Sequence, residues 1–177
     1  MSILVVYASK HGATRGIAEH IAQTLRALGR EADVVPVDAV ERLGTYDAVL
    51  LGSAVYYGSW MKEAVEFVRR NRVALAERPV WLFSSGPLGT EVQDSEEQPK
   101  ELGELQAAIG ARDHRLFYGA LDPHALSFPE RMVVKAVRAP QGDFRDWEAI
   151  AAWATDIARA LAPSAGGEST SHPASAR

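Results

Sequence analysis

Short apolar runs alternate with amphipathic segments along most of this chain. The apolar runs predict five buried strands, over residues 3–8, 32–37, 48–52, 80–83 and 115–118. Apolar residues recur at helical spacing in further segments, at about 17–28, 62–70, 102–109 and 146–161. Apolar strands separated by amphipathic helices are typical of a parallel sheet that is covered on both faces. The pattern therefore predicts an α/β fold, a doubly wound five-stranded parallel sheet with helices on both faces.

The length of 177 residues favours a single domain, which we place at residues 1–162. Residues 163–177 are small, polar and poor in apolar side chains, so they predict a disordered tail. The chain has no cysteine, no apolar run long enough to span a bilayer and no visible signal peptide, which favours a cytoplasmic protein. A net charge of −4 argues against nucleic acid as a partner.

The first predicted strand ends in a turn, Ser9-Lys10-His11-Gly12-Ala13-Thr14, that leads into a helix. Backbone N–H groups and the positive end of the helix dipole meet at such a junction, which suits a phosphate. The turn matches neither the triphosphate loop Gly-x-x-x-x-Gly-Lys-Ser/Thr nor the three-glycine dinucleotide fingerprint. Two interpretations remain: a phosphate cradle that uses the hydroxyls of Ser9 and Thr14, or an ordinary helix start capped by a hydroxyl residue.

Two later loops leave the same predicted edge of the sheet, where ligands of doubly wound sheets bind. Residues 52–60 hold three aromatic side chains around Gly58: Tyr56, Tyr57 and Trp60. Residues 84–89 are small and turn-rich, so their backbone amides could line the edge of a planar ligand. A phosphate cradle, aromatic platforms and amide donors together suit flavin mononucleotide (FMN). Core packing is the alternative interpretation of the aromatic residues.

The same residues resemble a known family. The turn from Ser9 to Thr14 resembles the flavodoxin phosphate loop, Ser/Thr-x-x-Gly-x-Thr, and Tyr57-Gly58-Ser59 is similar to the turn that contacts the isoalloxazine ring. Segments 119–121, 127–135 and 146–148 resemble one branch, the menaquinone-dependent protoporphyrinogen dehydrogenases. The resemblance covers about residues 1–161 and implies a flavodoxin-like fold that binds FMN.

The resemblance also implies a role for each matched position. Five residues would bind the FMN phosphate: Ser9, His11, Gly12, Ala13 and Thr14. Tyr57 would stack on the flavin and the Gly58 peptide would face its N5, with Tyr56 and Trp60 as further contacts. The pyrimidine edge would meet Ser84, Ser85 and Gly86. The 84–89 loop lacks the aromatic residue that usually covers the second flavin face in flavodoxins, which leaves one face open to a substrate.

Three functions remain open. The resemblance implies an FMN-dependent oxidoreductase that passes electrons from a reduced substrate, such as a porphyrinogen, to a quinone. The alternatives are a flavodoxin-type carrier that shuttles electrons between redox proteins, and a flavodoxin-like interaction module that binds no flavin. No catalytic residue and no metal site is assigned. His11, His114 and His124 could titrate near neutrality, but none has a visible partner in the sequence.

Two further segments have two interpretations each. Residues 91–97 are acidic and predict either a solvated loop or a docking rim for a basic partner. Residues 128–138 combine apolar and cationic side chains. This combination predicts either a covering helix packed on its own sheet, the commoner case, or a helix in peripheral contact with a membrane.

Overall fold

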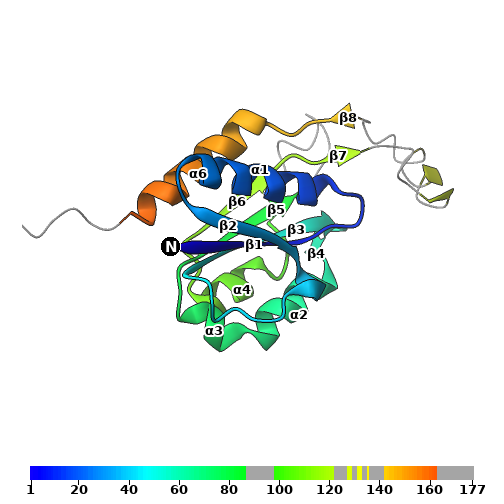
Figure 1. Cartoon of the computed structure of the whole chain (residues 1–177). Helices are drawn as coiled ribbons and strands as arrows, with labels where there is room; N and C mark the ends of the chain where they lie inside the picture. The colour runs from blue at the N-terminus through cyan, green and yellow to red at the C-terminus, as the bar shows by residue number, and fades with distance from the viewer. Residues whose placement is uncertain (87–97, 122–126, 129–130, 133–134, 136–141, 163–177) are drawn as a thin grey trace, which may run out of the picture.

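The computed structural model describes residues 1–86, 98–121, 127–128, 131–132, 135 and 142–162 (Figure 1). Strands and helices alternate along the chain, as the apolar pattern predicts. In chain order the elements are β1 (Ser2–Ala8), α1 (Ala13–Ala27), β2 (Glu31–Pro36), the 3-10 turn η1 (Val37–Ala39), β3 (Ala48–Tyr56), β4 (Ser59–Trp60), α2 (Lys62–Arg70), α3 (Arg72–Ala76), β5 (Val80–Ser85), α4 (Leu102–Ile109), β6 (Asp113–Phe117), β7 (Ala120–Leu121), β8 (Gly142–Asp143) and α6 (Trp147–Ala160).

Five parallel strands pair in the order β2-β1-β3-β5-β6, and β4 pairs antiparallel with β3. Helices α1 and α6 cover one face of this sheet, while α2, α3 and α4 cover the other (Figure 1). The predicted α/β fold, with a doubly wound five-stranded parallel sheet, is therefore confirmed. The chain moves from β1 to β2 on one side and later places β3 on the other side of β1. Loops that leave such a switch point diverge and open a crevice between them.

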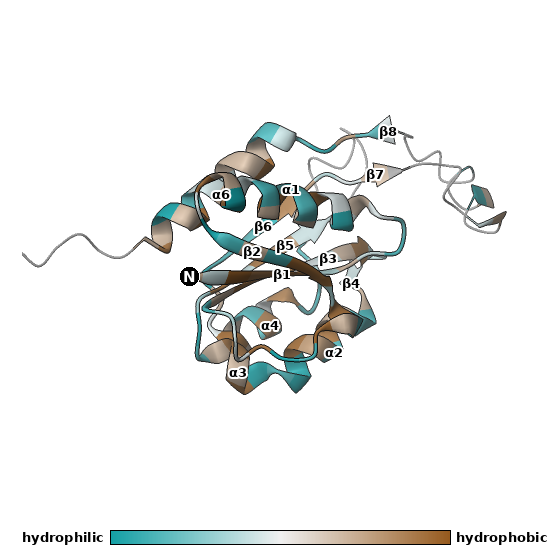
Figure 2. Ribbon diagram, viewed as in Figure 1, coloured by the Kyte–Doolittle hydropathy of each residue, from teal (hydrophilic) through white to brown (hydrophobic). Residues whose placement is uncertain are grey.

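The central strands are buried on both sides, so each face of the sheet has its own apolar cluster. In β1, Ile3 and Val5 join the cluster under α1 and α6, whereas Leu4 and Val6 join the cluster over α2 to α4. This alternation is the two-residue period of a strand. Figure 2 shows the apolar β1 and β3 in the middle of the fold. The loops at the ends of these strands therefore start from well-packed positions.

The structure extends the third predicted strand. The apolar run predicts an end at Gly52, but β3 continues to Tyr56 and folds back as β4. Gly52 interrupts the apolar pattern because the ring of Phe83 on β5 occupies the space that a side chain would need. The glycine thus reflects close packing inside a longer strand, and the strand does not end there.

The prediction that residues 128–138 pack on their own sheet is wrong for Phe128 and Met132. Both residues are helical, and their side chains are 72% and 55% exposed. Strands β7 and β8 pair with each other outside the main sheet. The helical fragments between them lie beyond the sheet edge in Figure 1, away from the strands on which a covering helix would pack.

Candidate functional site

The three loops of the predicted site begin at one edge of the sheet. The strand register sets Ala8, Ser53 and Ser84 side by side on β1, β3 and β5. Parallel strands carry their carboxyl ends to the same edge, so the segments after Ala8, Tyr56 and Ser85 leave together. This edge includes the switch point between β1 and β3, where ligands of open α/β sheets bind.

The first loop makes a tight turn into α1. Gly12 has a φ of 87°, in the left-handed region that favours glycine, and its N–H donates to Ser9 Oγ at 3.1 Å. The first bond of the helix runs from Gly16 N to Gly12 O at 2.9 Å, so the preceding N–H groups have no intrahelical carbonyl to bind. No acidic side chain lies in the first turn of α1. The start of α1 can therefore receive an anion.

Thr14 supplies a polar atom at the same place. It is fully buried, and its Oγ1 has no hydrogen-bond partner among the described residues. Leaving a buried hydroxyl unsatisfied costs about 1–3 kcal/mol, and such an atom calls for a ligand, an ion or a water. The N-cap of α1 is Gly12, with no side-chain cap, so the hydroxyl-capped helix start does not describe this junction. The residues present fit a phosphate group.

Tyr57 and Gly58 form the two-residue turn of the β3–β4 hairpin. Tyr56 pairs with Ser59, and the two turn residues have φ values of 51° and 74°. Positive φ at both positions defines a type I′ turn, the usual turn of two-residue hairpins. Tyr57 is 90% exposed at the tip of this hairpin. Its ring is available to stack on a flat ligand at the edge of the sheet.

Trp60 points into the protein instead. Its ring packs in the apolar cluster on the α2 side and is 4% exposed, and its Nε1 donates to Ser84 Oγ at 2.8 Å. Ser84 is fully buried, and its Oγ also lies 2.8 Å from His114 Nε2. Core packing, the alternative interpretation of the aromatic residues, therefore applies to Trp60. The Trp60 ring and the Ser84 hydroxyl therefore lie on the buried side of the candidate site and connect the hairpin to β5.

Burial lowers the pKa of His114 from 6.5 to about 4, although Asp113 acts in the opposite direction. The Ser84 hydroxyl accepts from Trp60, so it can donate its own proton to the neutral imidazole. The prediction that His114 titrates near neutrality without a partner is wrong. Pairing of β5 with β6 brings His114 to Ser84, and nothing in the local sequence of either residue signals this contact.

The first and second loops meet through two aromatic rings. The centroids of His11 and Tyr56 lie 6.5 Å apart, with the ring planes at 76°. Edge-to-face contacts of this kind are favourable for aromatic rings. Two residues from separate predicted loops are thus brought together.

The third loop starts close against its neighbours. Ser85 is buried, and the Gly86 N–H donates to the Phe117 carbonyl at 3.2 Å. A side chain at Gly86 would approach the Val55 Cβ to 3.1 Å, which is tighter than most real contacts. This end of β5 is therefore fixed between β3 and β6.

Arg145 links the distal part of the chain to the first loop, a feature that the sequence reasoning missed. Its Nε and Nη2 donate to the two carboxylate oxygens of Asp143 at 2.7 and 2.6 Å, and its guanidinium stacks 4.4 Å from the Trp147 ring centroid. Hydrogen bonding to Arg145 lowers the pKa of Asp143. A third nitrogen, Nη1, reaches the Ala13 carbonyl at 3.5 Å. We call Asp143, Arg145 and Trp147 the arginine clamp.

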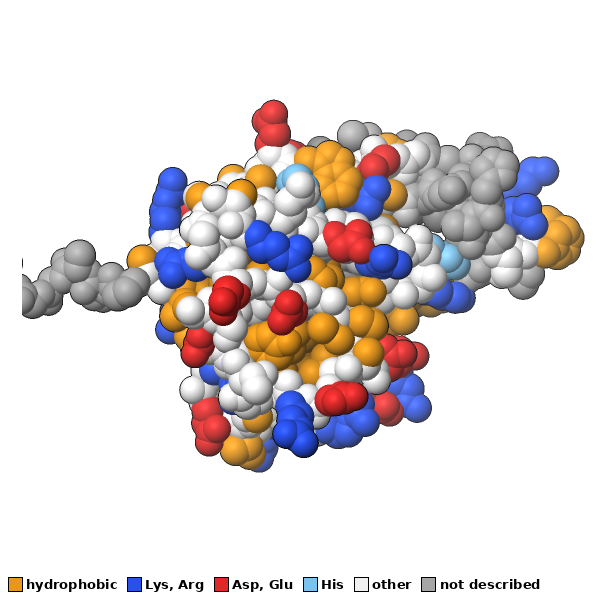
Figure 3. All heavy atoms as spheres, in the orientation of Figure 1, with side chains coloured by type: hydrophobic (Ala, Val, Ile, Leu, Met, Phe, Trp, Pro, Cys, Tyr) orange, Lys and Arg blue, Asp and Glu red, His pale blue; other side chains and the backbone are white. Residues whose placement is uncertain are grey.

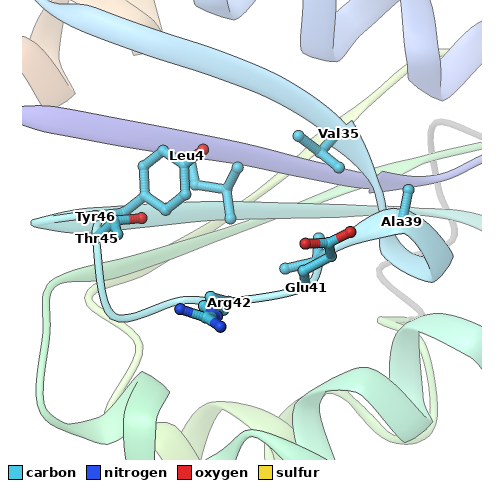
Figure 4. A pocket seen from close by; sticks show the side chains of 8 residues that line it. Leu4, Val35, Ala39, Glu41, Arg42, Thr45 and Tyr46 are labelled. Carbon is cyan, nitrogen blue, oxygen red and sulfur yellow. The ribbon is translucent and has the colours of Figure 1, made fainter.

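Two hollows on the described surface lie away from the three loops. One holds about 320 Å³ beside β2, with Leu4 and Val35 among its apolar lining and Glu41 and Arg42 among its polar lining (Figure 4). Figure 3 shows apolar atoms gathered in the middle of this face. The other holds about 330 Å³ and lies between α1 and Trp147. The candidate site is therefore assigned from the chemistry of the loops and not from the size of a hollow.

Several predictions concern residues outside the described ranges. These are residues 87–89 of the third loop, the acidic residues 91–97, His124, most of 128–138 and the tail at 163–177. Within the ranges that the structure describes, no helix is long and apolar enough to cross a membrane. No group of three His, Asp or Glu side chains in those ranges could hold a metal ion.

Comparison with known proteins adds relatives in sequence and in structure. The chain is 26% identical over 172 residues to protoporphyrinogen IX dehydrogenase [quinone] of Escherichia coli K12, covering 89% of this chain and 95% of that protein. Oxidised flavodoxin 2 of Bacillus cereus matches with a TM-score of 0.63 and 24% identity, over 91% of this chain and 100% of its own. A flavodoxin from the domain Archaea also gives a TM-score of 0.63, at 18% identity, over 90% and 98% of the two chains.

The flavodoxin domain family model matches residues 4–147, from β1 to the start of α6. This span contains the sheet with strand order β2-β1-β3-β5-β6 and all three loops at its carboxyl edge. The chain therefore belongs to the flavodoxin domain family.

Proposed function

We propose that this protein binds FMN at the carboxyl edge of its sheet and acts as an FMN-dependent oxidoreductase. The observation that carries the proposal is the buried Thr14 hydroxyl, which has no partner among the described residues and sits in the first turn of α1. Membership of the flavodoxin domain family supports FMN as the anionic ligand. FMN, when bound, supplies the electron-accepting and electron-donating ring.

Different residues of the chain would contact different parts of that ligand. The loop residues Ser9, His11, Gly12, Ala13 and Thr14 would bind the phosphate through backbone N–H groups and hydroxyls. The exposed Tyr57 would stack on the ring, beside Tyr56. The Gly58 peptide would face N5, and the 84–86 segment would meet the pyrimidine edge. Trp60 and the Ser84 hydroxyl keep the hairpin and β5 in place beneath these contacts.

The proposed reaction takes electrons from a reduced substrate and delivers them to a quinone-type acceptor. The similarity to a protein named protoporphyrinogen IX dehydrogenase [quinone] supports a porphyrinogen as that substrate. The exposed apolar side chains of Phe128 and Met132, beside Arg131 and Lys135, support a further part of the proposal. Segment 128–138 would contact a membrane surface, which is where an apolar quinone dissolves, from the cytoplasmic side.

A flavin titration tests the cofactor. FMN fluorescence should be quenched on addition of the purified chain, with a saturable dissociation constant, whereas riboflavin, which lacks the phosphate, should bind much more weakly. Equal binding of both compounds would contradict the phosphate site. A protein that stays colourless after incubation with FMN would support the flavin-free interaction module instead.

Turnover by the FMN-loaded protein tests the reaction. Porphyrinogen should be oxidised when a soluble quinone is present, and both compounds should be needed. Absence of turnover in a fully flavin-loaded sample would contradict the oxidoreductase proposal. A flavodoxin-type electron carrier, the other function typical of this family, would instead show two well-separated one-electron steps in a reductive titration and would need a reductase partner.

A further inference from the structure

The arginine clamp reaches the chain at the start of α1. The Nη1 atom of Arg145 donates to the Ala13 carbonyl at 3.5 Å. A side chain at Gly16 would collide with the same nitrogen, so the guanidinium packs closely against the first turn of the helix. This is the turn that holds the unpartnered Thr14 hydroxyl.

The Ala13 carbonyl and the Thr14 N–H belong to one peptide unit. In a trans peptide these two groups point in opposite directions, so the N–H points out of the start of α1. The first bond of the helix runs from Gly16 N to Gly12 O, which leaves the Thr14 N–H without a helical carbonyl to bind. A donor at the carbonyl polarises the peptide and strengthens the bond that its N–H can make. Arg145 therefore acts, from behind, on a group that is open to an anion.

The other contacts of Arg145 fix its direction. Its Nε and Nη2 bind the two carboxylate oxygens of Asp143, and its guanidinium stacks on Trp147, which leaves Nη1 for the Ala13 carbonyl. The Arg145 side chain is 17% exposed, so few alternative positions in water are open to it. Opposite charges on Asp143 and Arg145 largely cancel at a distance. What the clamp supplies to α1 is a donor aimed at one carbonyl.

We propose that Arg145 is a positioning residue of the FMN phosphate site, which orients and polarises the peptide between Ala13 and Thr14. This inference rests on the proposed function. Arg145 follows Ala13 by 132 residues, so the phosphate loop itself carries no sign of it. Its effect should be specific to the phosphate. Changes at Arg145 should therefore alter the affinity for FMN relative to that for riboflavin, which lacks the phosphate.

A conservative variant tests this role without losing the charge. Arg145→Lys keeps the cation and an aliphatic stem but lacks the planar fork that binds Asp143 and Ala13 together. FMN should bind about two- to tenfold more weakly, the range expected for one net hydrogen bond, while riboflavin affinity changes by less than about twofold. Arg159→Lys is the matched control, since Arg159 also binds an aspartate but lies in the last turn of α6, at the other end of that helix. It should bind FMN as the wild type does.

Asp143→Asn separates orientation from charge. Asparagine removes a negative charge near the site and can accept only one of the two bonds that fix the guanidinium. If Arg145 acts by orientation, this variant should bind FMN more weakly than the wild type. If Arg145 acted only through its charge, the variant would bind FMN more tightly.

Amide hydrogen exchange follows the peptide itself. FMN should slow exchange of the Thr14 amide in the wild-type protein, and should slow it less in Arg145→Lys. An unchanged ratio of FMN to riboflavin affinity in Arg145→Lys would overturn the inference, as would tighter FMN binding by Asp143→Asn or equal slowing of the Thr14 amide in both proteins. A wild-type chain that binds FMN no better than riboflavin is a different result, since it would overturn the proposed phosphate site itself.

Discussion

At the scale of single residues, the most telling atom is the Thr14 hydroxyl. It is buried in a protein that otherwise satisfies its buried polar side chains within the described residues. A group of this kind destabilises the protein without a ligand and gains a bond when the ligand arrives. Stability and ligand binding should therefore respond in opposite directions when the hydroxyl is removed.

Thr14→Val tests this opposition, because valine keeps the shape and removes the oxygen. We expect the free energy of unfolding without FMN to rise by about 1 kcal/mol, since an unsatisfied polar group is lost. FMN should bind about ten- to a hundredfold more weakly, the range for a hydrogen bond to a charged group. Chemical denaturation and fluorescence titration measure the two effects. Thr14→Ser, which keeps the hydroxyl, should bind FMN nearly as the wild type does, and unchanged FMN affinity in Thr14→Val would contradict the assignment.

His114 should make the protein sensitive to mild acid. Its pKa is about 4 in the folded protein, below the 6.5 of an unperturbed histidine. The unfolded chain therefore takes up a proton that the folded protein refuses, so stability should fall as pH drops from about 6.5 to 4 and level off below. In His114→Gln, urea denaturation across this range should show a shallower decline. Measurements at pH 8 give the part of the stability change that comes from losing the ring and does not depend on pH. If the free energy of unfolding depends on pH in the same way in both proteins, His114 does not cause the acid sensitivity.

Residue types in the first loop were sufficient to predict a candidate anion site, because Ser9, Gly12 and Thr14 act locally. Trp60 and His114 were different. The sequence shows an aromatic residue in a loop and an isolated histidine, whereas their positions depend on contacts with Ser84 from another strand. Contacts between distant strands leave no mark in the local pattern of residues.

At the scale of elements, the arginine clamp ties the strand β8 and the start of α6 to the first turn of α1. Gly16 in α1 allows this approach, because a side chain there would collide with the Arg145 guanidinium. Glycine inside a helix normally costs about 0.5–1 kcal/mol relative to alanine. The effect of replacing Gly16 on the free energy of unfolding should therefore change sign when Arg145 is removed.

A double-mutant cycle tests that dependence. In the wild-type background, Gly16→Ala should destabilise the protein by about 1 kcal/mol, because Arg145 must give up contacts with Asp143 and Trp147. In an Arg145→Ala background, the same substitution should stabilise the protein by about 0.5–1 kcal/mol, the ordinary gain in helix propensity. Thermal or urea unfolding of the four proteins provides the measurement. Equal changes in the free energy of unfolding in the two backgrounds would show that Arg145 does not pack closely against position 16 of α1.

The main helices and strands could be predicted from apolar periodicity, since each buries one stripe or one run. The β3–β4 hairpin could not, because its turn is made by Tyr57 and Gly58 and lacks the Asn-Gly or Asp-Gly pair that usually marks a type I′ turn. The two-stranded ribbon of β7 and β8 was also missed. Its strands have two residues each and lie 20 residues apart, which is too short for a period to be seen.

At the scale of the whole molecule, strand order decides where the candidate site lies. The β1–β3 switch point sends α1 to one face and α2 to the other, so the loops before them leave the same edge of the sheet, where ligands of such folds bind. The sequence predicted the fold class and this edge, since alternation of strands and helices is enough for both. It could not predict how Phe128 and Met132 sit, because their place depends on the β7–β8 ribbon outside the main sheet.

The exposed apolar side chains of Phe128 and Met132 predict binding to membranes. We expect the full chain to sediment with vesicles that contain anionic phospholipid, less so at high salt because Arg131 and Lys135 lie beside Phe128 and Met132. The double variant Phe128→Ser with Met132→Ser should lower the partition coefficient by about tenfold or more. Val73→Ser is a matched control, since Val73 is 67% exposed on α3. Equal loss in the control, or no loss in the double variant, would contradict a specific membrane contact.

The left-handed conformation of Tyr57 has a consequence for how this chain could change over time. A non-glycine residue with φ 51° lowers the free energy of unfolding by about 1 kcal/mol relative to glycine or asparagine at the same position. The exposed Tyr57 ring adds little to the stability of the folded chain. Under the proposed function, stacking on the flavin would offset the cost of the left-handed conformation. In relatives of this fold that do not bind flavin, we expect Gly or Asn at this position while the hairpin itself persists. The identity of one residue could then separate working flavoproteins from relatives that kept only the fold.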